Sequence, residues 1–366
     1  MRFKAAILHE IGQPLSIETV DAELRAPDDV LVRIRAAGLC HTDLEVIQGE
    51  LGYPLPIVLG HQAAGIVEAV GPAVTTLAPG DHVILSWNPH CGRCYYCAHD
   101  QPILCETYLR HAPEAVMFDG STRLSLKGRP LRHMFYLAAF AEYAIVSAQS
   151  AVKVSDRLPF ECGCLIGCGV MTGVGAAMKI GRPGMGDTVV VIGCGAVGLS
   201  AVQGARLAGA GRVIAVDLAP EKLALAARLG ATDQLQASER DVVRAIRGLT
   251  SGRGADVVIE AAGNDAAFRL SVESARPGGQ VIWLGKVNVD REVHFRWGSL
   301  MGEKRIVRSS YGGARPQEDF PALSQMYLDG RLQLDPLIST RLTLDEINDG
   351  FEAMRRGTVV RAVVTM

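Results

Sequence analysis

Hydrophobic and polar residues alternate in short runs over the first part of the chain. Runs of this kind, bounded by Gly and Pro, predict strands at residues 29–36, 63–70, 83–85 and 141–146. Helical periodicity is scarce up to about residue 160. The pattern therefore predicts a β-rich domain in this part of the chain.

From about residue 170, buried apolar runs alternate with amphipathic stretches. We expect strands at residues 188–192, 212–216, 256–260 and 280–284. Between and around them we expect helices at residues 197–208, 220–229, 239–249 and 265–275. Such alternation is typical of a parallel sheet covered by helices on both faces.

Beyond about residue 310 the pattern is mixed again, and it ends in an apolar strand at residues 361–365. The sequence thus predicts an α/β protein of two domains. A doubly wound domain, residues 170–310, is inserted into a β-rich domain formed by residues 1–169 and 311–366.

The composition agrees with a globular protein of this size. A chain of 366 residues with 48% hydrophobic and 21% charged residues can bury two cores. The net charge of -2, without blocks of like charge, argues against a nucleic-acid partner. The apolar run at residues 5–8 is too short for a signal peptide, and the longest apolar candidate for a membrane span, residues 135–148, is interrupted by Glu142. We therefore expect a cytoplasmic protein with no membrane partner.

A glycine motif follows the strand expected at residues 188–192 and opens the next helix. Its first glycine permits a tight turn, its second lets the backbone approach a diphosphate, and its third lets the helix pack against the strand. The diphosphate would lie at the helix N-terminus, where free N–H groups favour anions. The motif comprises Gly193, Cys194, Gly195, Ala196, Val197 and Gly198.

Asp217 ends the next expected strand, 19 residues after Gly198. A carboxylate in this position binds both ribose hydroxyls and repels a 2′-phosphate, which favours NAD over NADP. The alternative is a glycine turn with Asp217 as a strand-end cap. Lys222 could add a ribose contact, or it could be a solvated surface lysine.

The nine cysteines are expected to be reduced in the cytoplasm, and most of them are clustered. One cluster offers four thiolates in a short loop, which closes a tetrahedron around zinc and makes a structural site. Iron–sulfur clusters also use four cysteines, but the surrounding sequence favours zinc. The four residues are Cys91, Cys94, Cys97 and Cys105.

Cys40, His61 and Cys168 are a dispersed second set of metal ligands. Two thiolates and one imidazole leave a fourth position open for water or substrate, as in catalytic zinc sites. Each residue taken singly could belong to the core, and spacing alone does not unite the three.

Over essentially its whole length the chain resembles the zinc-containing medium-chain alcohol dehydrogenases. The matching stretches are residues 38–43, 60–61, 91–105, 167–173 and 193–198. Residues 119–133 are similar to a segment of the longer branch that liver-type, glutathione-dependent and mycothiol-dependent formaldehyde dehydrogenases share. The resemblance implies a GroES-like catalytic domain joined to a Rossmann domain, with two zinc ions per chain and NAD as cofactor.

The resemblance also implies roles for single residues near the catalytic zinc. It carries Cys40, His61 and Cys168 over as the ligands of that zinc, and the four clustered cysteines as ligands of the structural one. Asp43 matches the carboxylate that orients the histidine ligand. Thr42 matches the hydroxyl that accepts the proton of the alcohol before hydride leaves for the cofactor.

Further positions match cofactor contacts of the family. His41 and Arg361 fall where the family places contacts near the diphosphate. The nicotinamide carboxamide is held in the family by backbone groups near the positions of Leu284 and Tyr311.

Two residues depart from the family pattern. Gln62 follows His61 where the family has glutamate, so the metal should be more electron-poor. We expect an altered pH dependence and retained activity. Glu45 replaces the usual relay histidine; it could be the terminal proton acceptor, or a solvated loop glutamate.

The positions expected to line the substrate pocket are mostly bulky, namely Trp87, Arg110, Met134 and Phe135. They favour a medium-sized aromatic or aliphatic alcohol over ethanol. Lys286 follows the last strand expected in the doubly wound domain and indicates either a polar group on the substrate or a surface lysine.

The predicted function is reversible oxidation of a primary alcohol to its aldehyde with NAD. A thiol-adduct formaldehyde dehydrogenase is the alternative. Leu51 and Leu109 occupy the places of the glutathione-specific carboxylate and arginine, with Arg110 one step away, so a mycothiol-type substrate is harder to exclude. A non-catalytic NAD-binding protein is the remote alternative, since the chain keeps its zinc ligands and Thr42. By resemblance, we expect a homodimer or homotetramer that pairs the edges of the doubly wound sheets.

Overall fold

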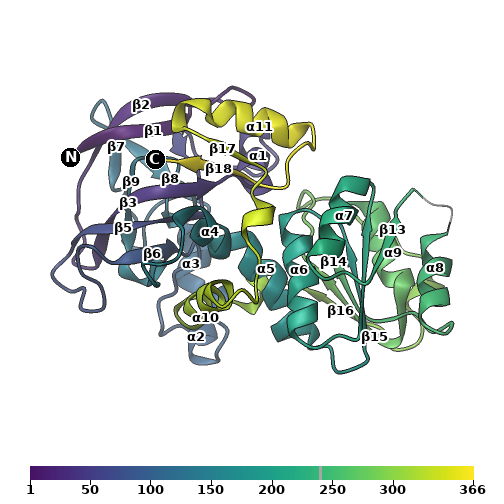
Figure 1. Cartoon of the computed structure of the whole chain (residues 1–366). Helices are drawn as coiled ribbons and strands as arrows, with labels where there is room; N and C mark the ends of the chain where they lie inside the picture. Colours follow the sequence, from purple (N-terminus) through teal and green to yellow (C-terminus); the bar gives the residue numbers. More distant parts are fainter. Residues whose placement is uncertain (239–240) are drawn as a thin grey trace. The chain divides into compact units, whose positions relative to one another are not determined.

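The computed structural model describes residues 1–238 and 241–366. The first two residues of the helix expected at 239–249 lie outside the described residues, and the helix α8 is found at Val242–Leu249. The chain forms two compact units: Met1–Cys168 with Arg315–Met366, and Gly169–Ala314. In Figure 1 the first unit is coloured purple, blue and yellow, and the second teal to green.

The first unit contains a closed barrel and a seven-stranded sheet, as a β-rich domain requires. The barrel runs in the order β1 (Arg2–Leu8), β2 (Ser16–Ala22), β7 (Leu124–Leu126), β8 (Arg129–His133) and β4 (Ile57–Val58). The sheet runs in the order β10 (Ala151–Lys153), β6 (His82–Leu85), β5 (Ala63–Val70), β3 (Asp29–Gly38), β18 (Ala362–Thr365) and β17 (Thr340–Leu342), with β9 (Tyr143–Ser147) also paired to β3.

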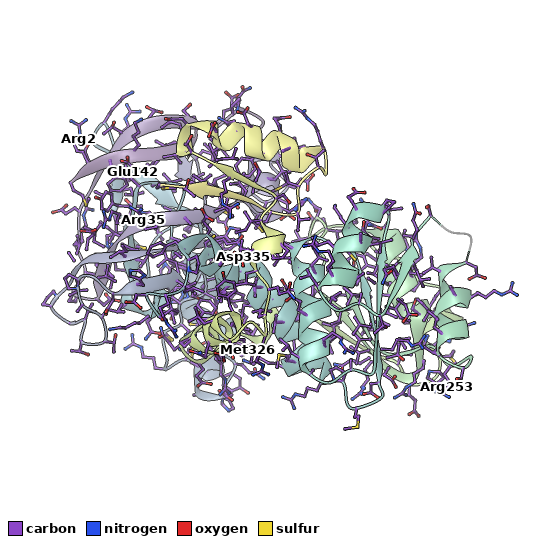
Figure 2. All side chains as sticks on the ribbon, viewed as in Figure 1. Arg2, Arg35, Glu142, Arg253, Met326 and Asp335 are labelled. Atoms are coloured by element: carbon purple, nitrogen blue, oxygen red, sulfur yellow. The ribbon has the colours of Figure 1, made fainter. Side chains whose placement is uncertain are left out.

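The last strand of the chain joins this sheet beside its central strand. β18 pairs antiparallel with the end of β3, where Val363 lies opposite Gly38. This pairing holds the C-terminal strand close to Cys40, which lies two residues after the end of β3. Glu142, which interrupts the apolar run at residues 135–148, accepts a 2.8 Å hydrogen bond on its carboxylate from the backbone N–H of Lys4 in β1. Glu142 is labelled in Figure 2.

Helices complete the first unit. Short helices follow the strands and loops at α1 (His41–Gln48), α2 (Tyr95–Ala98), η1 (Pro102–Leu104) and α3 (Glu106–His111). Two longer helices come from the C-terminal segment, α10 (Pro316–Leu328) and α11 (Ile347–Arg355). Proline at the first position of α10 fits a helix start, because its missing N–H would have no intrahelical partner there.

None of these helices was predicted from the sequence, and neither was the long helical stretch at residues 160–181. α4 (Phe160–Leu165), η4 (Ile166–Val170), α5 (Met171–Gly175) and η5 (Ala176–Gly181) follow one another without interruption, and η4 and η5 are π-helical. The resulting helix of 22 residues, Phe160–Gly181, is long and apolar enough to cross a membrane, so the expectation that residues 135–148 are the longest apolar candidate was wrong. Of its most apolar window 72% is buried within the protein, and a buried core helix has the same composition.

The second unit is built on a six-stranded parallel sheet. Its order is β13 (Asp233–Gln236), β12 (Arg212–Asp217), β11 (Thr188–Ile192), β14 (Ala255–Glu260), β15 (Ala275–Trp283) and β16 (Arg305–Arg308). Figure 1 shows α6 (Ala196–Leu207) on one side of this sheet, and α8 and α9 (Asp265–Ser274) on the other; α7 is Pro220–Arg228. This is the expected doubly wound arrangement.

The core of this unit explains why its strands were predictable. Val190, Ile214, Val258 and Val281 lie on neighbouring strands and are completely buried. Burying each such side chain contributes roughly 1.5–3 kcal/mol. The direction of strand addition reverses between β11 and β14, and ligands of doubly wound sheets bind outside the carboxyl ends of the strands at this point.

Candidate functional site

Four cysteine sulfurs meet in the loop between β6 and α3. Their Sγ atoms all lie within 4.8 Å of one another, and the backbone N–H of Cys91 donates to Sγ of Cys105 at 3.3 Å. Cys94 begins α2 and Cys105 begins α3, so short helices fix both halves of the loop. Four sulfurs at this separation fit a tetrahedral zinc ion with no open position. The four residues are Cys91, Cys94, Cys97 and Cys105.

The protonation of this set is uneven without a metal. Burial favours the Cys91 thiol, but hydrogen bonds from the backbone of Arg93 and the side chain of Thr107 lower its pKa to about 6. Burial and the neighbouring Cys94 raise the pKa of Cys97 to about 12. A metal ion therefore has to displace protons from part of the set. None of the nine cysteines, all of which the structure describes, forms a disulfide.

Cys40, His61 and Cys168 come from three distant segments and meet at a second site. Cys40 lies between β3 and α1, His61 between β4 and β5, and Cys168 in the π-helical turn η4. Their ligand atoms lie within 4.8 Å of one another, and Nε2 of His61 is 3.5 Å from Sγ of Cys168. Two sulfurs and one imidazole fit a zinc ion with one open coordination position. The fold thus brings together three residues that spacing alone could not unite.

Asp43 fixes the orientation of the histidine. One carboxylate oxygen accepts hydrogen bonds from Nδ1 of His61 and the backbone N–H of Gly60, each at 3.1 Å, and the other accepts from the backbone N–H of Cys40 at 3.1 Å. The Asp43 carboxylate is completely buried, so these donors offset its loss of solvent. With a proton on Nδ1, the lone pair of Nε2 points to the metal site.

The same contacts set the charges of the metal-free site. Burial disfavours a charged imidazole, but Asp43 and the Cys40 thiolate outweigh it and raise the pKa of His61 to about 10. A hydrogen bond from Cys168 holds the pKa of Cys40 well below its ordinary value. The same hydrogen bond raises the pKa of Cys168 well above its ordinary value. Zinc therefore replaces protons on His61 and Cys168.

Gln62 and Arg361 are buried close to these ligands. Nε2 of Gln62 donates to the carbonyl of Leu165 at 3.4 Å, whereas its Oε1 has no hydrogen-bond partner among the described residues. Arg361 donates to the carbonyl of Leu39 and is only 5% exposed. Its positive charge acts on the thiols of Cys40 and Cys168 and lowers their pKa values.

The first turns of α1 carry the predicted proton relay. Thr42 and Glu45 are both half-buried, and residues three apart lie on the same face of a helix. His41 is exposed at the start of this helix.

Aromatic side chains border His61. The ring of Phe135 meets that of His61 edge-on, with centroids 5.4 Å apart, and also meets Trp87 at 5.4 Å and Tyr53 at 6.1 Å. Tyr53 was missed in the sequence, where its place between Gly52 and Pro54 indicated only a loop. Burial, followed by the charge of Asp43, raises the pKa of Tyr53.

The other residues expected to line the pocket differ in burial. Met134 is completely buried and belongs to the hydrophobic core, while Arg110 is exposed in α3. Lys286, after β15 in the second unit, is also exposed.

The glycine motif of the second unit has the geometry of a diphosphate site. Gly193 has φ 91°, and a Cβ there would lie 2.8 Å from the backbone N of Ala262. A Cβ on Gly198 would lie 1.7 Å from the carbonyl oxygen of Gly193. Gly195 precedes α6, and nothing lies within 4 Å of where its Cβ would be. The helix N-terminus, which includes Ala196 and Val197, is therefore open to an anion.

Asp217 ties the end of β12 to this motif. Its carboxylate accepts hydrogen bonds from the backbone N–H of Cys194 at 2.6 Å and of Ala219 at 2.9 Å. Lys222 is half-buried in α7, and its charge acts on Cys194. Carboxylate and lysine thus both border the glycine loop, as a ribose site requires.

A buried carboxylate that we did not predict holds the loop after β14. Glu260 accepts hydrogen bonds from the backbone N–H groups of Ala262 at 2.8 Å and Gly263 at 2.7 Å. Its own carbonyl accepts from the backbone N–H of Leu284 at 2.8 Å. Tyr311, the other position expected near the nicotinamide, is 2% exposed and has φ 59°.

Comparison with known families agrees with this geometry. Residues 26–156 match the Alcohol dehydrogenase GroES-like domain, and residues 196–329 match the family described as Zinc-binding dehydrogenase. The S-(hydroxymethyl)glutathione dehydrogenase of Escherichia coli O1:K1 / APEC is 36% identical over 367 residues, which is 100% of both chains.

Comparison with solved structures also finds similarity to alcohol dehydrogenases. An alcohol dehydrogenase zinc-binding domain protein from Burkholderia ambifaria has a TM-score of 0.95 and 37% identity, covering 100% of this chain and 99% of that one. Benzyl alcohol dehydrogenase from Acinetobacter calcoaceticus has a TM-score of 0.94 and 31% identity with the same coverage. The expected GroES-like and Rossmann folds are confirmed. The chain therefore belongs to the zinc-containing medium-chain alcohol dehydrogenases, oxidoreductases that use zinc and a nicotinamide dinucleotide.

Proposed function

We propose that this enzyme oxidises primary alcohols with an aromatic or medium-length apolar body to their aldehydes, and reduces the aldehydes in reverse. The observation that carries the proposal is the contact of Phe135 with His61, with Trp87 and Tyr53 beside it. Aromatic surface next to a metal ligand favours a hydrocarbon body whose reacting carbon lies at the metal. A small alcohol such as ethanol would leave this surface largely uncovered.

The residues of α1 supply the proton path. Cys40, His61 and Cys168 would hold a zinc ion, which would supply Lewis acidity toward the substrate oxygen. Oγ1 of Thr42 accepts the proton of the alcohol, and the carboxylate of Glu45, on the same helix face, is the next acceptor. Asp43 keeps the proton of His61 on Nδ1 throughout, so Nε2 stays available as a ligand.

The cofactor proposed is NAD. The support is Asp217, whose carboxylate borders the glycine loop at the point where a 2′-phosphate would place negative charge. Repulsion between the Asp217 carboxylate and the 2′-phosphate would disfavour binding of NADP.

A thiol-adduct formaldehyde dehydrogenase is the second candidate. It is supported by the 36% identity with S-(hydroxymethyl)glutathione dehydrogenase and by the resemblance of residues 119–133. Leu51 and the exposed Leu109 argue against glutathione itself, because neither can pair with its charged groups. A mycothiol-type adduct is compatible with both residues.

NADH absorbance separates the candidates. Purified enzyme is assayed with ethanol, hexanol, benzyl alcohol and cinnamyl alcohol, and with formaldehyde in the presence and absence of glutathione or mycothiol, using NAD and NADP in parallel. Strong turnover of the larger alcohols with NAD supports the first proposal. Turnover confined to formaldehyde with a thiol replaces it with the second.

We also propose a cytoplasmic homo-oligomer that pairs the edges of its parallel sheets. The edge strand β16 is exposed along its length, and Ile306 and Val307 are each 36% exposed. An uncovered apolar edge strand is a template for pairing with another chain. The absence of disulfides among the nine described cysteines suits a reducing compartment.

A further inference from the structure

Residues 134–138, which carry Phe135, have an unusual backbone. Phe135 has φ 48° and ψ 39°, Tyr136 has φ 65° and Ala138 has φ 54°. L side chains rarely adopt this left-handed conformation, and it persists only where surrounding contacts hold it. Contacts with other parts of the chain must therefore hold residues 134–138 in this conformation; we call such a contact an anchor.

Tyr136 provides a polar anchor. Its hydroxyl donates a 2.6 Å hydrogen bond to the backbone carbonyl of Tyr108, and its side chain is only 2% exposed. The two rings lie 5.3 Å apart, and the ring of Phe118 meets Tyr136 edge-on at 5.1 Å. A buried hydroxyl of this kind specifies one orientation of its ring.

The anchor belongs to the structural zinc loop. Tyr108 lies in α3, which begins directly after Cys105, and Cys105, Tyr108 and Tyr136 share one hydrophobic cluster. The ring of Trp87, four residues before Cys91, lies between Tyr108 at 6.3 Å and Phe135 at 5.4 Å. A continuous set of contacts thus runs from the four-cysteine loop to Phe135.

We propose that Tyr136 is a positioning residue that ties the aromatic wall of the substrate site to the structural zinc loop. The inference rests on the proposed function, since the wall is the surface that selects aromatic alcohols. Through Tyr136, the four-cysteine loop holds Phe135 against His61 and sets the width of the site.

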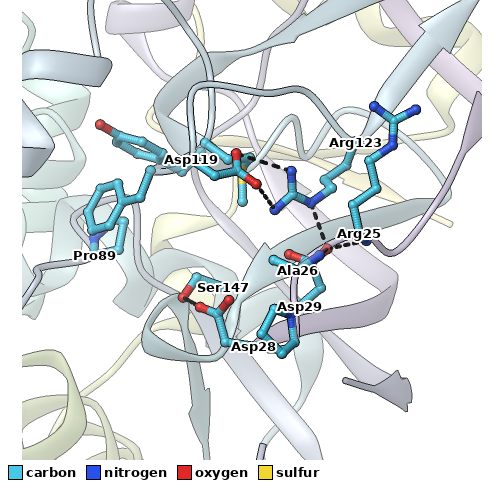
Figure 3. A pocket seen from close by; sticks show the side chains of 12 residues that line it. Arg25, Ala26, Asp28, Asp29, Pro89, Asp119, Arg123 and Ser147 are labelled. Atoms are coloured by element: carbon cyan, nitrogen blue, oxygen red, sulfur yellow. Dashed lines mark hydrogen bonds and ion pairs between the residues drawn. The ribbon is translucent and has the colours of Figure 1, made fainter. Parts of the chain in front are cut away.

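A pocket next to Tyr136 increases the importance of the hydrogen bond from its hydroxyl to Tyr108 for holding Tyr136 in position. Tyr136 is one of the residues that line a pocket of about 440 Å³, together with Met117, Phe118 and Pro89, and the close-up in Figure 3 shows the polar rim of this pocket. There the buried Arg123 bonds to Asp29 at 2.6 Å and to Asp119 at 3.0 Å, so the rim is fixed. The pocket gives Tyr136 a neighbouring space, and its hydrogen bond to Tyr108 would oppose movement of the residue into that space.

The test removes one hydroxyl and keeps the ring. Tyr136→Phe is compared with wild type and with Tyr327→Phe, whose hydroxyl lies 3.6 Å from Sγ of the buried Cys162 in another part of the same unit. Zinc content is measured for each protein. Hydrogen exchange of residues 134–140 is followed by mass spectrometry, and kcat and KM are measured for benzyl alcohol and ethanol.

We expect exchange in this segment to become roughly three- to tenfold faster in Tyr136→Phe and to stay unchanged in Tyr327→Phe. The ratio of kcat/KM for benzyl alcohol over ethanol should fall by a similar factor through KM for benzyl alcohol, with KM for NAD and zinc content unchanged. Unchanged exchange overturns the proposal. Faster exchange with equal losses for both alcohols also overturns it, because the hydroxyl would then be structural only. Exchange is measured without substrate, so failure of the alcohol assay in wild type counts against the proposed function alone.

Discussion

Asp43 accepts a hydrogen bond from Nδ1 of His61 at 3.1 Å, and both side chains are almost completely buried. Asp43→Asn removes the charge that holds the Nδ1 proton, so His61 loses its fixed orientation. We expect affinity for the catalytic zinc to fall about 10- to 100-fold, while the four-cysteine site keeps its metal. Zinc per chain after dialysis against a graded chelator measures this. Asp28→Asn, at an exposed carboxylate bonded to Ser147, is the control; equal zinc in all three proteins would contradict the assigned role.

The raised pKa of His61 predicts how zinc uptake depends on pH. In the metal-free protein the pKa of His61 is about 10, above its ordinary value, so the charged form stabilises the fold fully below about pH 6.5 and this contribution is lost as the pH rises through 10. Zinc needs the neutral imidazole, so its affinity should increase about tenfold per pH unit for each proton displaced. Competition with a chelator between pH 6 and 9 measures the slope. A pH-independent affinity at the three-ligand site would refute the prediction.

The neutral side chain of Gln62 leads to a prediction about the pH profile of catalysis, which should differ between wild type and Gln62→Glu. Gln62 is completely buried, directly follows the metal ligand His61 in the chain, and has no negative charge of its own. Gln62→Glu adds a carboxylate behind the metal, which opposes charge development on the substrate oxygen. The midpoint of kcat/KM for alcohol oxidation should move to higher pH by about one unit. Gln62→Met, neutral and of similar volume, should keep the wild-type midpoint; a shift common to both variants would point to packing instead of charge.

Asp217 predicts the cofactor preference. Asp217→Asn keeps one oxygen to accept from the backbone near Cys194 but removes the charge that repels a 2′-phosphate. We expect kcat/KM to fall for NAD and rise for NADP, changing their ratio about 10- to 100-fold. Initial rates with each cofactor measure the ratio. Asp233→Asn, which removes a carboxylate paired with Arg212 at 3.5 Å, should leave it unchanged.

Much of the second unit could be predicted from the sequence. Its central strands are continuous apolar runs, and its glycine motif is required by the backbone geometry of one short segment. β11 was predicted at its observed bounds, and β12 and β14 within one residue. The short strand β13 and the exposed β16 were missed, because neither is a buried apolar run. The helix from Phe160 was missed because glycine and cysteine interrupt its apolar pattern without interrupting the helix.

The two metal sites also differ in how far the sequence predicted them, because one is local in sequence and the other is formed by tertiary folding. The four-cysteine loop is local in sequence and was evident from spacing, whereas Cys40, His61 and Cys168 meet only through tertiary folding and were united by resemblance. No residue pattern indicates that Tyr53 would meet Phe135, because that contact depends on a left-handed backbone in one segment and a loop in another.

The edge strand β16 supports a final prediction about assembly. Ile306 and Val307 are partly exposed on an edge whose backbone can pair with a second copy, while Trp297, 77% exposed, adds apolar surface before it. Ile306→Lys places a charge in that edge, and desolvating it on pairing is unfavourable. We expect wild type to run as a dimer or tetramer in light scattering after size exclusion, and the variant to shift toward smaller species at micromolar concentration. Met185→Lys, at a fully exposed methionine in the same unit, is the matched control. A monomeric wild type would contradict edge pairing, and an unshifted variant would place the interface on another surface of the chain.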